Sequence, residues 1–512
     1  MAAGFLDYVD QRAGLLVGRG GDLARPTAYS FPHRTFQEYL AGCYLIGRRD
    51  VAREYYARAG EGDYWAVAAQ LGAEELLYNL RRPHELLDLI YRLCPERPPT
   101  DAQARRSDLW AGRMAAMIGP AMIAQDIDSP DGGPAFLSRL LPRQVALLSS
   151  DLSAPERAEA GRSLARLGDP RPGVGLRPDP LPNPPPIRGR GQDFPPSGDR
   201  RKDRGGESAS PTSLAAFEKA LPDLLWLDIP AGPCLMGEDN EQHELTLPAY
   251  WISKYPVTNA QFEAFVADGG YTDRWRPCWT EAGWQQKEKE GWTEPRYWHD
   301  ADLNAANQPV VGVSWYEAVA FCRWLSEQTG QAIRLPTEAE WEKAARGGEP
   351  SPEPVEGEDP ARPSTGSGRE GSGREGSGRD QGGATARIYP WGDDPDPNKA
   401  NYDDTNIGTT SAVGCFPSGA SPYGVEEMSG NVWEWTMSLW GKDFGKPDFG
   451  YPYDPADGRE DLPIGAEGDN LRVLRGGAFH FNLDYVRCAY RFGSRPVGRS
   501  WYNGFRLVVS PF

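Results

Sequence analysis

The side chains best suited to redox or metal chemistry are the cysteines and histidines, and their spacing favours neither a zinc site nor a disulfide framework. The cysteines are scattered, odd in number and form no CxxC pair: Cys43, Cys94, Cys234, Cys278, Cys322, Cys415 and Cys488. The histidines show no HExxH spacing: His33, His84, His243, His299 and His480. We therefore expect free thiols, solvated or hydrogen-bonded imidazoles, and a reducing cytoplasmic location.

Two nucleophile and phosphate motifs are missing from the sequence. There is no GxSxG turn of the kind that exposes a catalytic serine, although a Ser-His-Asp triad built from distant residues stays open. There is also no GxxxxGK[ST] loop, so the sequence does not support NTP hydrolysis by this chain.

The last segment, Leu471 to Phe512, has a composition suited to binding. It opens with an apolar strand candidate and the Gly476-Gly477 turn, and it closes with a strand candidate from Gly504 to Ser510. The run between them is rich in Tyr, Phe, Trp, Asn, Ser, Arg and Gly. This mixture is typical of antibody paratopes, where aromatic rings give contact area and small polar residues adapt their hydrogen bonds.

Length and charge limit the possible partners. The chain has 512 residues, a net charge of -18 and a mean hydropathy of -0.60. The negative charge argues against nucleic acid or an anionic membrane as the main partner. No apolar stretch is long enough to span a bilayer, and the start of the sequence lacks the pattern of a signal peptide.

The sequence divides into three parts. Residues 1–167 read as a helical module, in which Phe36, Tyr39, Leu40, Cys43 and Tyr44 follow the period of an amphipathic helix. Further helices are predicted near 65–80 and 84–93. Residues 168–212, rich in Pro, Gly and charge, read as a disordered linker.

Residues 213–512 read as one α+β domain. Strand pairs are predicted at 225–236 and 245–255. Three helices begin at capping boxes, in which Thr258, Ser314 and Thr337 are each followed three residues later by Gln or Glu. Residues 349–385 contain repeated GSGRE pentads and read as a low-complexity insertion.

Eight ordered motifs of this domain resemble the formylglycine-generating enzyme family, also called sulfatase-modifying factor. They are IPAGPCLMG from Ile229, YPVTNAQFEAFV from Tyr255, PVVGVSWYEAVAFCRWL from Pro309, RLPTEAEWEKAAR from Arg334, YPWG from Tyr389, GNVWEW from Gly430, LRGG from Leu474 and GFRLV from Gly504. The resemblance implies a C-type-lectin-like fold in its formylglycine-enzyme variant, preceded here by the all-α module.

The enzymes of this family hold copper with two cysteines of the last segment, five residues apart. The matching positions of this chain are Phe481 and Val486, and neither side chain can bind a metal. Cys488 lies two residues beyond and is expected to be a buried structural thiol. The resemblance therefore implies no copper and puts the oxidase activity in doubt.

The last segment also resembles the variable region of proteins that diversity-generating retroelements diversify. The positions matching the fixed scaffold are Arg475, Gly476, Gly477, Val486, Arg487, Ala489, Arg491, Pro496, Arg499, Gly504, Phe505 and Arg506. The positions matching the variable, ligand-binding set are His480, Phe481, Asn482, Asp484, Tyr485, Tyr490, Phe492, Ser494, Arg495, Gly498, Ser500, Trp501, Tyr502 and Asn503. Phe479, which follows the glycine turn in strand phase, is expected in the core.

The formylglycine-enzyme resemblance implies a possible calcium site. The positions that match the family's ligands around the GNVWEW motif are Glu427, Gly430, Val432 and Glu434. A second family site would begin at Asn401 and Tyr402. Side-chain and carbonyl oxygens of this kind suit a hard cation, whereas the alternative is that Asn431 and Glu434 only hydrogen-bond the loop.

FPHRTFQEYLAGCYL, from Phe31 to Leu45, resembles the helical segment that follows the nucleotide-binding core of NACHT-type NTPases. This resemblance implies a separate NACHT-type ATPase as a possible partner.

Taken together, the sequence favours a non-catalytic protein that displays a hypervariable surface to a protein or other macromolecular ligand. Neither nucleic acid nor a membrane is an expected partner. The alternatives are an oxidase of the formylglycine type acting on a sulfatase cysteine, and a signalling module working with a NACHT ATPase.

Overall fold

The computed structural model describes residues 17–22, 25–30, 34–97, 102–127, 132–177, 220–348, 387–460 and 470–509. The predicted insertion at 349–385 lies outside the described residues, as does the greater part of the predicted linker. The chain forms two compact units. One contains the residues up to Arg171 together with 304–308 and 405–418, and the other contains the rest. Each is described by itself.

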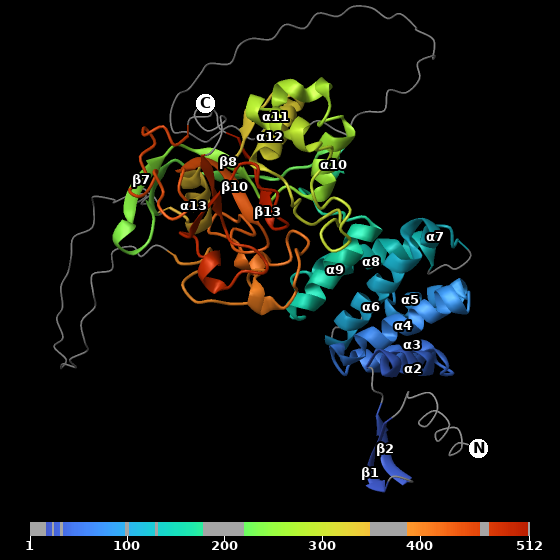
Figure 1. Ribbon diagram of the computed structural model, residues 1–512. Coiled ribbons are helices and arrows are strands. Elements are labelled where there is room, and N and C mark those ends of the chain that lie inside the picture. Colours follow the sequence, from blue (N-terminus) through green and yellow to red (C-terminus); the bar gives the residue numbers. More distant parts are fainter. Residues whose placement is uncertain are drawn as a thin grey trace, which may run out of the picture. The chain divides into compact units, whose positions relative to one another are not determined.

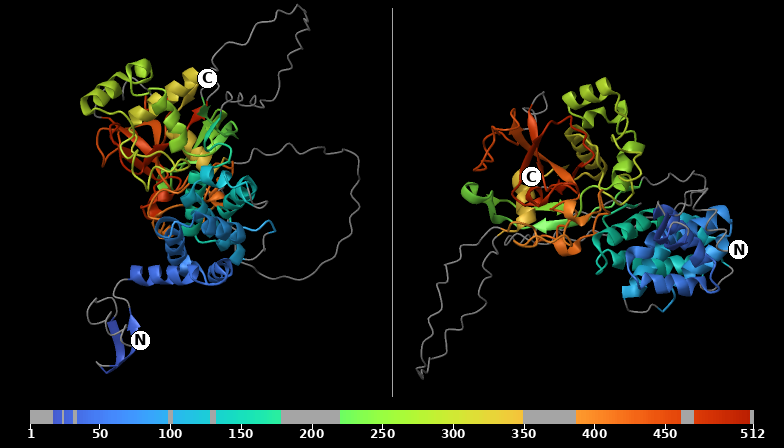
Figure 2. Two further views of the ribbon diagram at one scale, coloured as in Figure 1. Left: turned by 90° about the vertical axis from the view of Figure 1, so that its right-hand side faces the viewer. Right: turned by 60° about the horizontal axis from the view of Figure 1, so that its bottom comes forward.

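The first unit is helical, as its apolar periodicity predicts (Figures 1 and 2). Its helices are α2 (Arg34–Ile46), α3 (Val51–Ala59), α4 (Ala66–Glu74), α5 (Pro83–Leu93), α6 (Ala102–Ile118), α7 (Pro120–Ala124), α8 (Gly133–Leu147) and α9 (Ala154–Leu167). A hairpin of β1 (Val17–Asp22) and β2 (Arg25–Ser30) precedes them. The core gathers around Trp110 and Leu140, which are almost completely buried.

Helix α2 buries a different face from the one that its apolar pattern indicates. Phe36, Leu40 and Tyr44 are each about half exposed, whereas Gly42 and Leu45 are buried. The reason is a close crossing with α4, because a Cβ on Gly42 would lie 2.5 Å from the carbonyl oxygen of Ala68. Close backbone approach therefore decides the packing of α2 more than side-chain hydrophobicity does.

Helix α4 continues into a π-helix, Glu75–Asn79. The amide of Leu80 donates to the carbonyl of Glu75 at 2.9 Å, a hydrogen bond that spans five residues instead of four. Such wide turns are rare and occur frequently at functional sites.

Two segments of the region predicted to be lectin-like belong to the helical unit. Residues 405–418 contribute Ala412, Cys415 and Phe416 to its buried core, where the Arg157 guanidinium lies 5.1 Å from the centroid of the Phe416 ring. Asn307, from 304–308, donates to the carbonyl of Gly161 at 2.9 Å. The apolar side chains of 405–418 pack with the helices, and the family motifs of the sequence do not predict this packing.

The residues that open the predicted linker have a defined structure. Strand β3 (Leu176–Arg177) pairs with β4 (Leu221–Pro222), and Val174 is buried. The hydroxyl of Thr258 donates to the carbonyl of Val174 at 2.7 Å, which ties this stretch to a helix start. The composition of this stretch predicts disorder, because it does not reveal hydrogen-bond partners that lie far along the chain.

The second unit contains two four-stranded sheets. One has the order β12 (Arg491–Ser494), β11 (Leu471–Arg475), β10 (Trp433–Gly441), β13 (Asn503–Phe505). The other has the order β5 (Trp226–Ile229), β8 (Tyr250–Ser253), β14 (Val508–Val509), β9 (Ile333–Arg334). Strands β6 (Gly232–Met236) and β7 (His243–Leu247) pair separately, so β5 and β6 do not form the hairpin that their adjacency indicates.

The three capped helices form where the sequence predicts them. They are α10 (Asn259–Ala267), α12 (Trp315–Thr329) and α13 (Glu338–Arg346), and each has both hydrogen bonds of its capping box. A fourth helix, α11 (Glu281–Glu290), has a Thr280 cap and ends at Gly291 in the left-handed region, signals that the sequence interpretation did not use. Helix α13 lies beside β10 (Figure 1).

The final predicted strand is divided in two. Strand β13 joins the first sheet and β14 joins the second, with Arg506 and Leu507 between them. Side chains of residues 504–509 do not alternate between buried and exposed, as they would in a strand with one solvent-facing side, since Arg506 and Val508 are as buried as Phe505. Arg506 can be buried because its guanidinium donates hydrogen bonds to the buried carboxylate of Glu434.

Candidate functional site

The last segment forms much of the first sheet and is turned back on itself by two glycines. It supplies β11, β12 and β13, and β11 pairs with both β10 and β12. Gly476 and Gly477 have φ values of +96° and +73°. A Cβ on Gly477 would lie 2.6 Å from Cγ1 of Val486, so the predicted tight turn needs glycine for space as well as conformation.

Four arginines fix the path of the segment by binding buried carboxylates. Arg475 binds Glu338 and Glu342, and Arg491 also binds Glu338, both carboxylates belonging to α13. Further along, Arg499 reaches Glu317 at 2.9 Å and Arg506 reaches Glu434 at 2.6 Å. All four arginines belong to the set that resembles a fixed scaffold.

The guanidinium groups make further hydrogen bonds inside the protein. Arg475 donates to the carbonyls of Cys488 and Ala489 at 2.8 and 2.9 Å, which anchors the returning chain. Burial disfavours its charge, but neighbouring Tyr451, Glu342 and Glu338 outweigh that effect and raise its pKa. Arg475 therefore stays charged, as its role in the pair requires.

The positions that resemble the fixed scaffold are mostly buried. Nine of the scaffold positions are buried, and the side chains of Arg491 and Arg499 are only about a tenth exposed. Those nine are Arg475, Gly476, Gly477, Val486, Ala489, Pro496, Gly504, Phe505 and Arg506.

The positions that resemble variable ones are half-buried or exposed, with one exception. Asn482, Asp484, Arg495 and Trp501 are exposed. Half-buried are His480, Phe481, Tyr485, Tyr490, Phe492, Ser494, Gly498, Ser500 and Tyr502. Asn503 is buried in β13. Trp501 is thus exposed as expected, whereas Tyr502 is half-buried.

The structure brings most of these rings into one aromatic patch, which we define by Trp433, Phe479, His480, Phe481, Tyr485, Tyr490, Phe492, Trp501 and Tyr502. Buried Trp433 is its floor, with ring centroids 5.6 Å from Phe481 and 5.5 Å from Phe492. At the surface His480 stacks on Trp501 at 4.5 Å. The contacts are tilted or edge-to-face in the main, a geometry that stabilises aromatic clusters.

Two members of the patch were not among the predicted ligand-binding residues. Phe479 is buried, as its strand phase predicts, and contacts Trp501 at 4.9 Å. Trp433 belongs to β10, and only its place in the GNVWEW motif marks it in the sequence. Trp433 pairs in register with Asn503, which lies 70 residues later in the sequence, so its place under the patch could not be predicted from local sequence.

Two of the positions that resemble variable ones carry buried polar atoms with no hydrogen-bond partner within the described part of the chain. These atoms are Nδ1 of His480 and both side-chain polar atoms of Asn503. Burial lowers the pKa of His480, so its imidazole is neutral at pH 7. A neutral imidazole and a primary amide offer both donors and acceptors to a ligand or to water.

The two positions that the family resemblance matches to copper-binding cysteines belong to the packing of the segment. Phe481 lies in the aromatic patch and Val486 is buried beside Gly477. Cys488 is buried, as expected, and burial raises the pKa of its thiol to about 12. In the described ranges, no three His, Cys, Asp or Glu side chains are grouped as a metal centre would require.

The residues that match calcium ligands fit a cation only in part. The Glu434 carboxylate accepts from Arg506 at 2.6 and 2.8 Å and from the Trp341 indole at 2.7 Å, so its oxygens are engaged. The Gly430 carbonyl accepts from the amide of Val432 at 2.9 Å. Calcium binding stays a prediction, with Glu427 as a buried carboxylate of this loop.

The second set of predicted calcium ligands lies beside the first. Asn401 forms a parallel bridge with Gly430, and its carbonyl accepts from the amide of Asn431 at 2.7 Å. Tyr402 is buried, and burial raises the pKa of its phenol to about 12. Tyr402 packs with Tyr389 and Val486, and the nearby Asp404 carboxylate adds to the rise in the phenol pKa.

Comparison with known proteins identifies the family. The model of the sulfatase-modifying factor enzyme 1-like domain matches residues 213–511, more than half of the chain. The chain therefore belongs to this family. The fold is α+β, with the C-type-lectin-like architecture of the formylglycine-generating enzymes preceded by an all-α module.

Relatives at moderate identity include enzymes. Hercynine oxygenase of Mycobacterium tuberculosis is 32% identical over 305 residues, covering 56% of this chain and 58% of that protein. Formylglycine-generating enzyme of Mus musculus is 26% identical over 346 residues, covering 59% of this chain and 79% of that protein. The chain thus spans less than two thirds of the hercynine oxygenase that it matches.

Solved structures with a similar chain path include Treponema denticola variable protein 1. Its identity is 20% and its TM-score 0.35, covering 56% of this chain and 95% of that one.

Within the described residues, no helix is both long and apolar enough to cross a membrane.

We predict that Arg475→Met destabilises the protein by about 3–5 kcal/mol, because it leaves Glu338 and Glu342 buried with one cation fewer. The matched control is Arg487→Met, which removes a partly exposed pair with Glu238 and should cost about 1 kcal/mol or less. Denaturant unfolding of both variants measures the difference. Equal losses would contradict the role given to the buried pairs.

The calcium prediction separates Glu427 from Glu434. We expect calcium added to EDTA-treated protein to raise the melting temperature, and Glu427→Gln to remove that rise. Glu434→Gln should lower the melting temperature with or without calcium, since it breaks the pair with Arg506. A melting temperature of the unchanged protein that calcium does not alter would refute calcium binding.

Proposed function

We propose that this protein is a non-catalytic binding protein whose lectin-like domain presents the aromatic patch to a macromolecular ligand. The observation that carries the proposal is the division of the last segment. Arginines of the scaffold set pair with buried carboxylates, and its glycines are buried. Residues of the types found in paratopes lie at least partly at the surface. A surface held in place before binding loses less entropy when a ligand arrives.

The chemistry of the patch supports a protein or another extended ligand. Tyr, Trp, Phe and His rings give broad contact area with few rotatable bonds, and they are rich in binding hot spots. Exposed Asp484 and Arg495 add opposite charges to the same segment. Such a surface suits a large partner that covers several rings at once.

The proposal includes diversification by a retroelement, which rests on the resemblance of the segment to such variable regions. The expected genomic finding is a near-copy of the DNA that encodes 475–506, close to the gene and different mainly at adenines, with a reverse transcriptase nearby. A neighbourhood that holds neither would sink this part of the proposal and leave the binding function standing.

Tolerance to substitution tests the display function without knowledge of the ligand. We expect a library randomised at exposed Asn482, Asp484, Arg495 and Trp501 to keep most members folded, because surface changes cost about 0.5 kcal/mol or less. A control library randomised at buried Arg475, Gly477, Arg506 and Phe505 should lose nearly all members. Protease resistance of the displayed proteins reports folding, and similar survival of the two libraries would contradict the proposal.

The enzyme relatives make an oxidase the second candidate. Incubation with a cysteine-containing sulfatase peptide, copper and oxygen tests it, with mass spectrometry of the peptide as the readout. We expect no conversion, because Phe481 and Val486 carry no thiolate. Conversion that survives Cys488→Ser would show an active site built from other residues and would overturn the non-catalytic function.

A signalling role beside a separate NACHT-type ATPase is a further proposal. Its basis is the resemblance at Phe31 to Leu45, of which residues 34–45 lie in α2 and the first three lie outside the described residues. Co-purification of such an ATPase with the full chain would separate this role from a free-standing receptor.

A further inference from the structure

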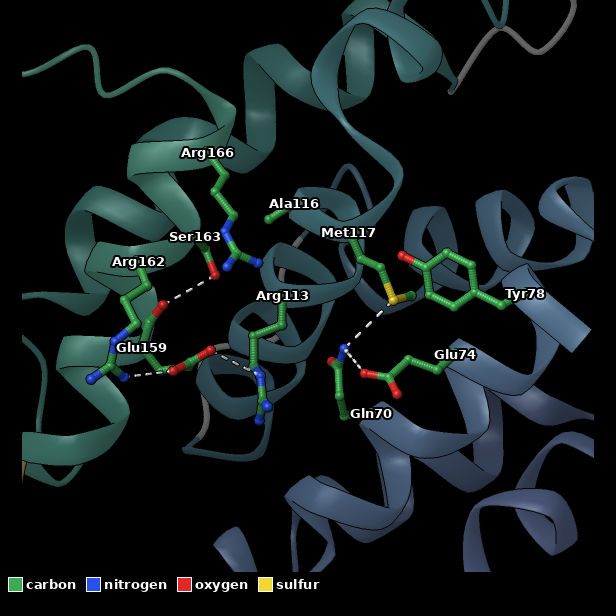
Figure 3. Close-up of a pocket in the computed structure, with 10 residues that line it drawn as sticks. All are labelled: Gln70, Glu74, Tyr78, Arg113, Ala116, Met117, Glu159, Arg162, Ser163 and Arg166. Carbon is green, nitrogen blue, oxygen red and sulfur yellow. Dashed lines mark hydrogen bonds and ion pairs between the residues drawn. The ribbon is translucent and has the colours of Figure 1, made fainter. Parts of the chain in front are cut away.

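The helical unit contains a pocket far in sequence from the aromatic patch and unrelated to its chemistry. It has a volume of about 310 Å³, within the range of small-molecule sites. Figure 3 shows its walls, which come from α4 with the following π-helix, from α6 and from α9. The lining residues are Gln70, Glu74, Tyr78, Arg113, Ala116, Met117, Glu159, Arg162, Ser163 and Arg166.

One side of this pocket is cationic. Glu159 is shared between Arg113 at 3.2 Å and Arg162 at 2.8 Å, so one carboxylate serves two guanidinium groups. No carboxylate of the described residues pairs with Arg166, whose guanidinium extends across the pocket toward α6 in Figure 3. Three arginines against two glutamates leave an excess of positive charge in a protein of net charge -18.

The opposite side is aromatic and amide-bearing. Tyr78 and Met117 form an apolar surface on which a planar ring can lie. Gln70 donates to Glu74 at 3.1 Å, while its Oε1 is buried with no partner in the described part of the chain. That oxygen can accept a hydrogen bond from an amino group on the planar ring of a ligand.

The π-helix Glu75–Asn79 is an independent sign of function. It carries Tyr78 and forms the wide last turn after α4, at the edge of the pocket. π-helices are rare and occur frequently at functional sites.

We propose that this pocket binds a nucleoside phosphate. The arginines of α6 and α9 receive the phosphate groups, for which guanidinium forks are well suited, and the base lies against Tyr78 and Met117 with its amino group toward Gln70. The sequence has no GxxxxGK[ST] loop, so the proposal is for binding and includes no hydrolysis. The site is separate from the proposed ligand-binding patch.

Calorimetry of the full chain in EDTA tests the proposal with ATP, adenosine and inorganic triphosphate as probes. ATP should bind, adenosine should bind much more weakly because it lacks the anion, and triphosphate should bind much more weakly because it lacks the base. Absence of ATP binding at millimolar concentration, or triphosphate binding as tight as ATP, would overturn the proposal.

Two variants place the site. Arg166→Gln should weaken ATP binding about tenfold or more, and Tyr78→Ala about fivefold or more with no effect on triphosphate. The control Arg82→Gln removes an exposed arginine that pairs with exposed Glu85, and it should change nothing. All three side chains are exposed, so unfolding is not expected. ATP binding that neither pocket variant weakens would place the nucleotide elsewhere and refute this site.

Discussion

The pairing of buried arginines with buried glutamates decides the course of the last segment. Four guanidinium groups from within 32 residues of sequence enter the interior, and each finds a carboxylate held by α12, α13 or β10. Removing two charges from water costs nearly as much as their attraction returns, so such pairs add little net stability. What they impose is specificity, since any other path would leave a charge buried alone.

This constraint explains how a surface and its support can be independent. Arg475 binds the carbonyls of Cys488 and Ala489 as well as two carboxylates, so the turn after Gly477 is held by contacts that involve no ring of the aromatic patch. The rings still touch one another, as the contact of Tyr485 with Tyr490 at 4.9 Å shows. Their packing is lateral, above a fixed floor of Trp433.

Local signals of the sequence predict the fold well where the partners are close in the chain. Capping boxes at Thr258, Ser314 and Thr337 place three helices, and the glycine pair places the turn. The family motifs predict the architecture. The same reasoning fails where a distant residue decides the outcome, as for Arg506, whose partner Glu434 is 72 residues away and allows the final strand to divide.

Candidate sites show the same division. The aromatic composition of the last segment indicates a binding surface, yet the floor residue Trp433 and the burial of Asn503 depend on strand pairing that composition does not reveal. The arginine pocket has no sequence signature at all. Its residues come from three separate stretches of the chain, 70–78, 113–117 and 159–166, and the sequence interpretation did not predict the π-helix that carries Tyr78.

The packing of residues 405–418 in the helical unit has a practical consequence for the boundaries of the family domain. The match to the family begins at residue 213, which invites a cut just before it. Such a cut would remove α9 and the other helices that cover Ala412, Cys415 and Phe416. A shortened chain would then expose a buried thiol and a phenyl ring to solvent, and would be prone to aggregate and oxidise. The helical unit therefore shields apolar side chains that belong to the matched family domain. A chain expressed for study should begin well before residue 213, where the family match starts.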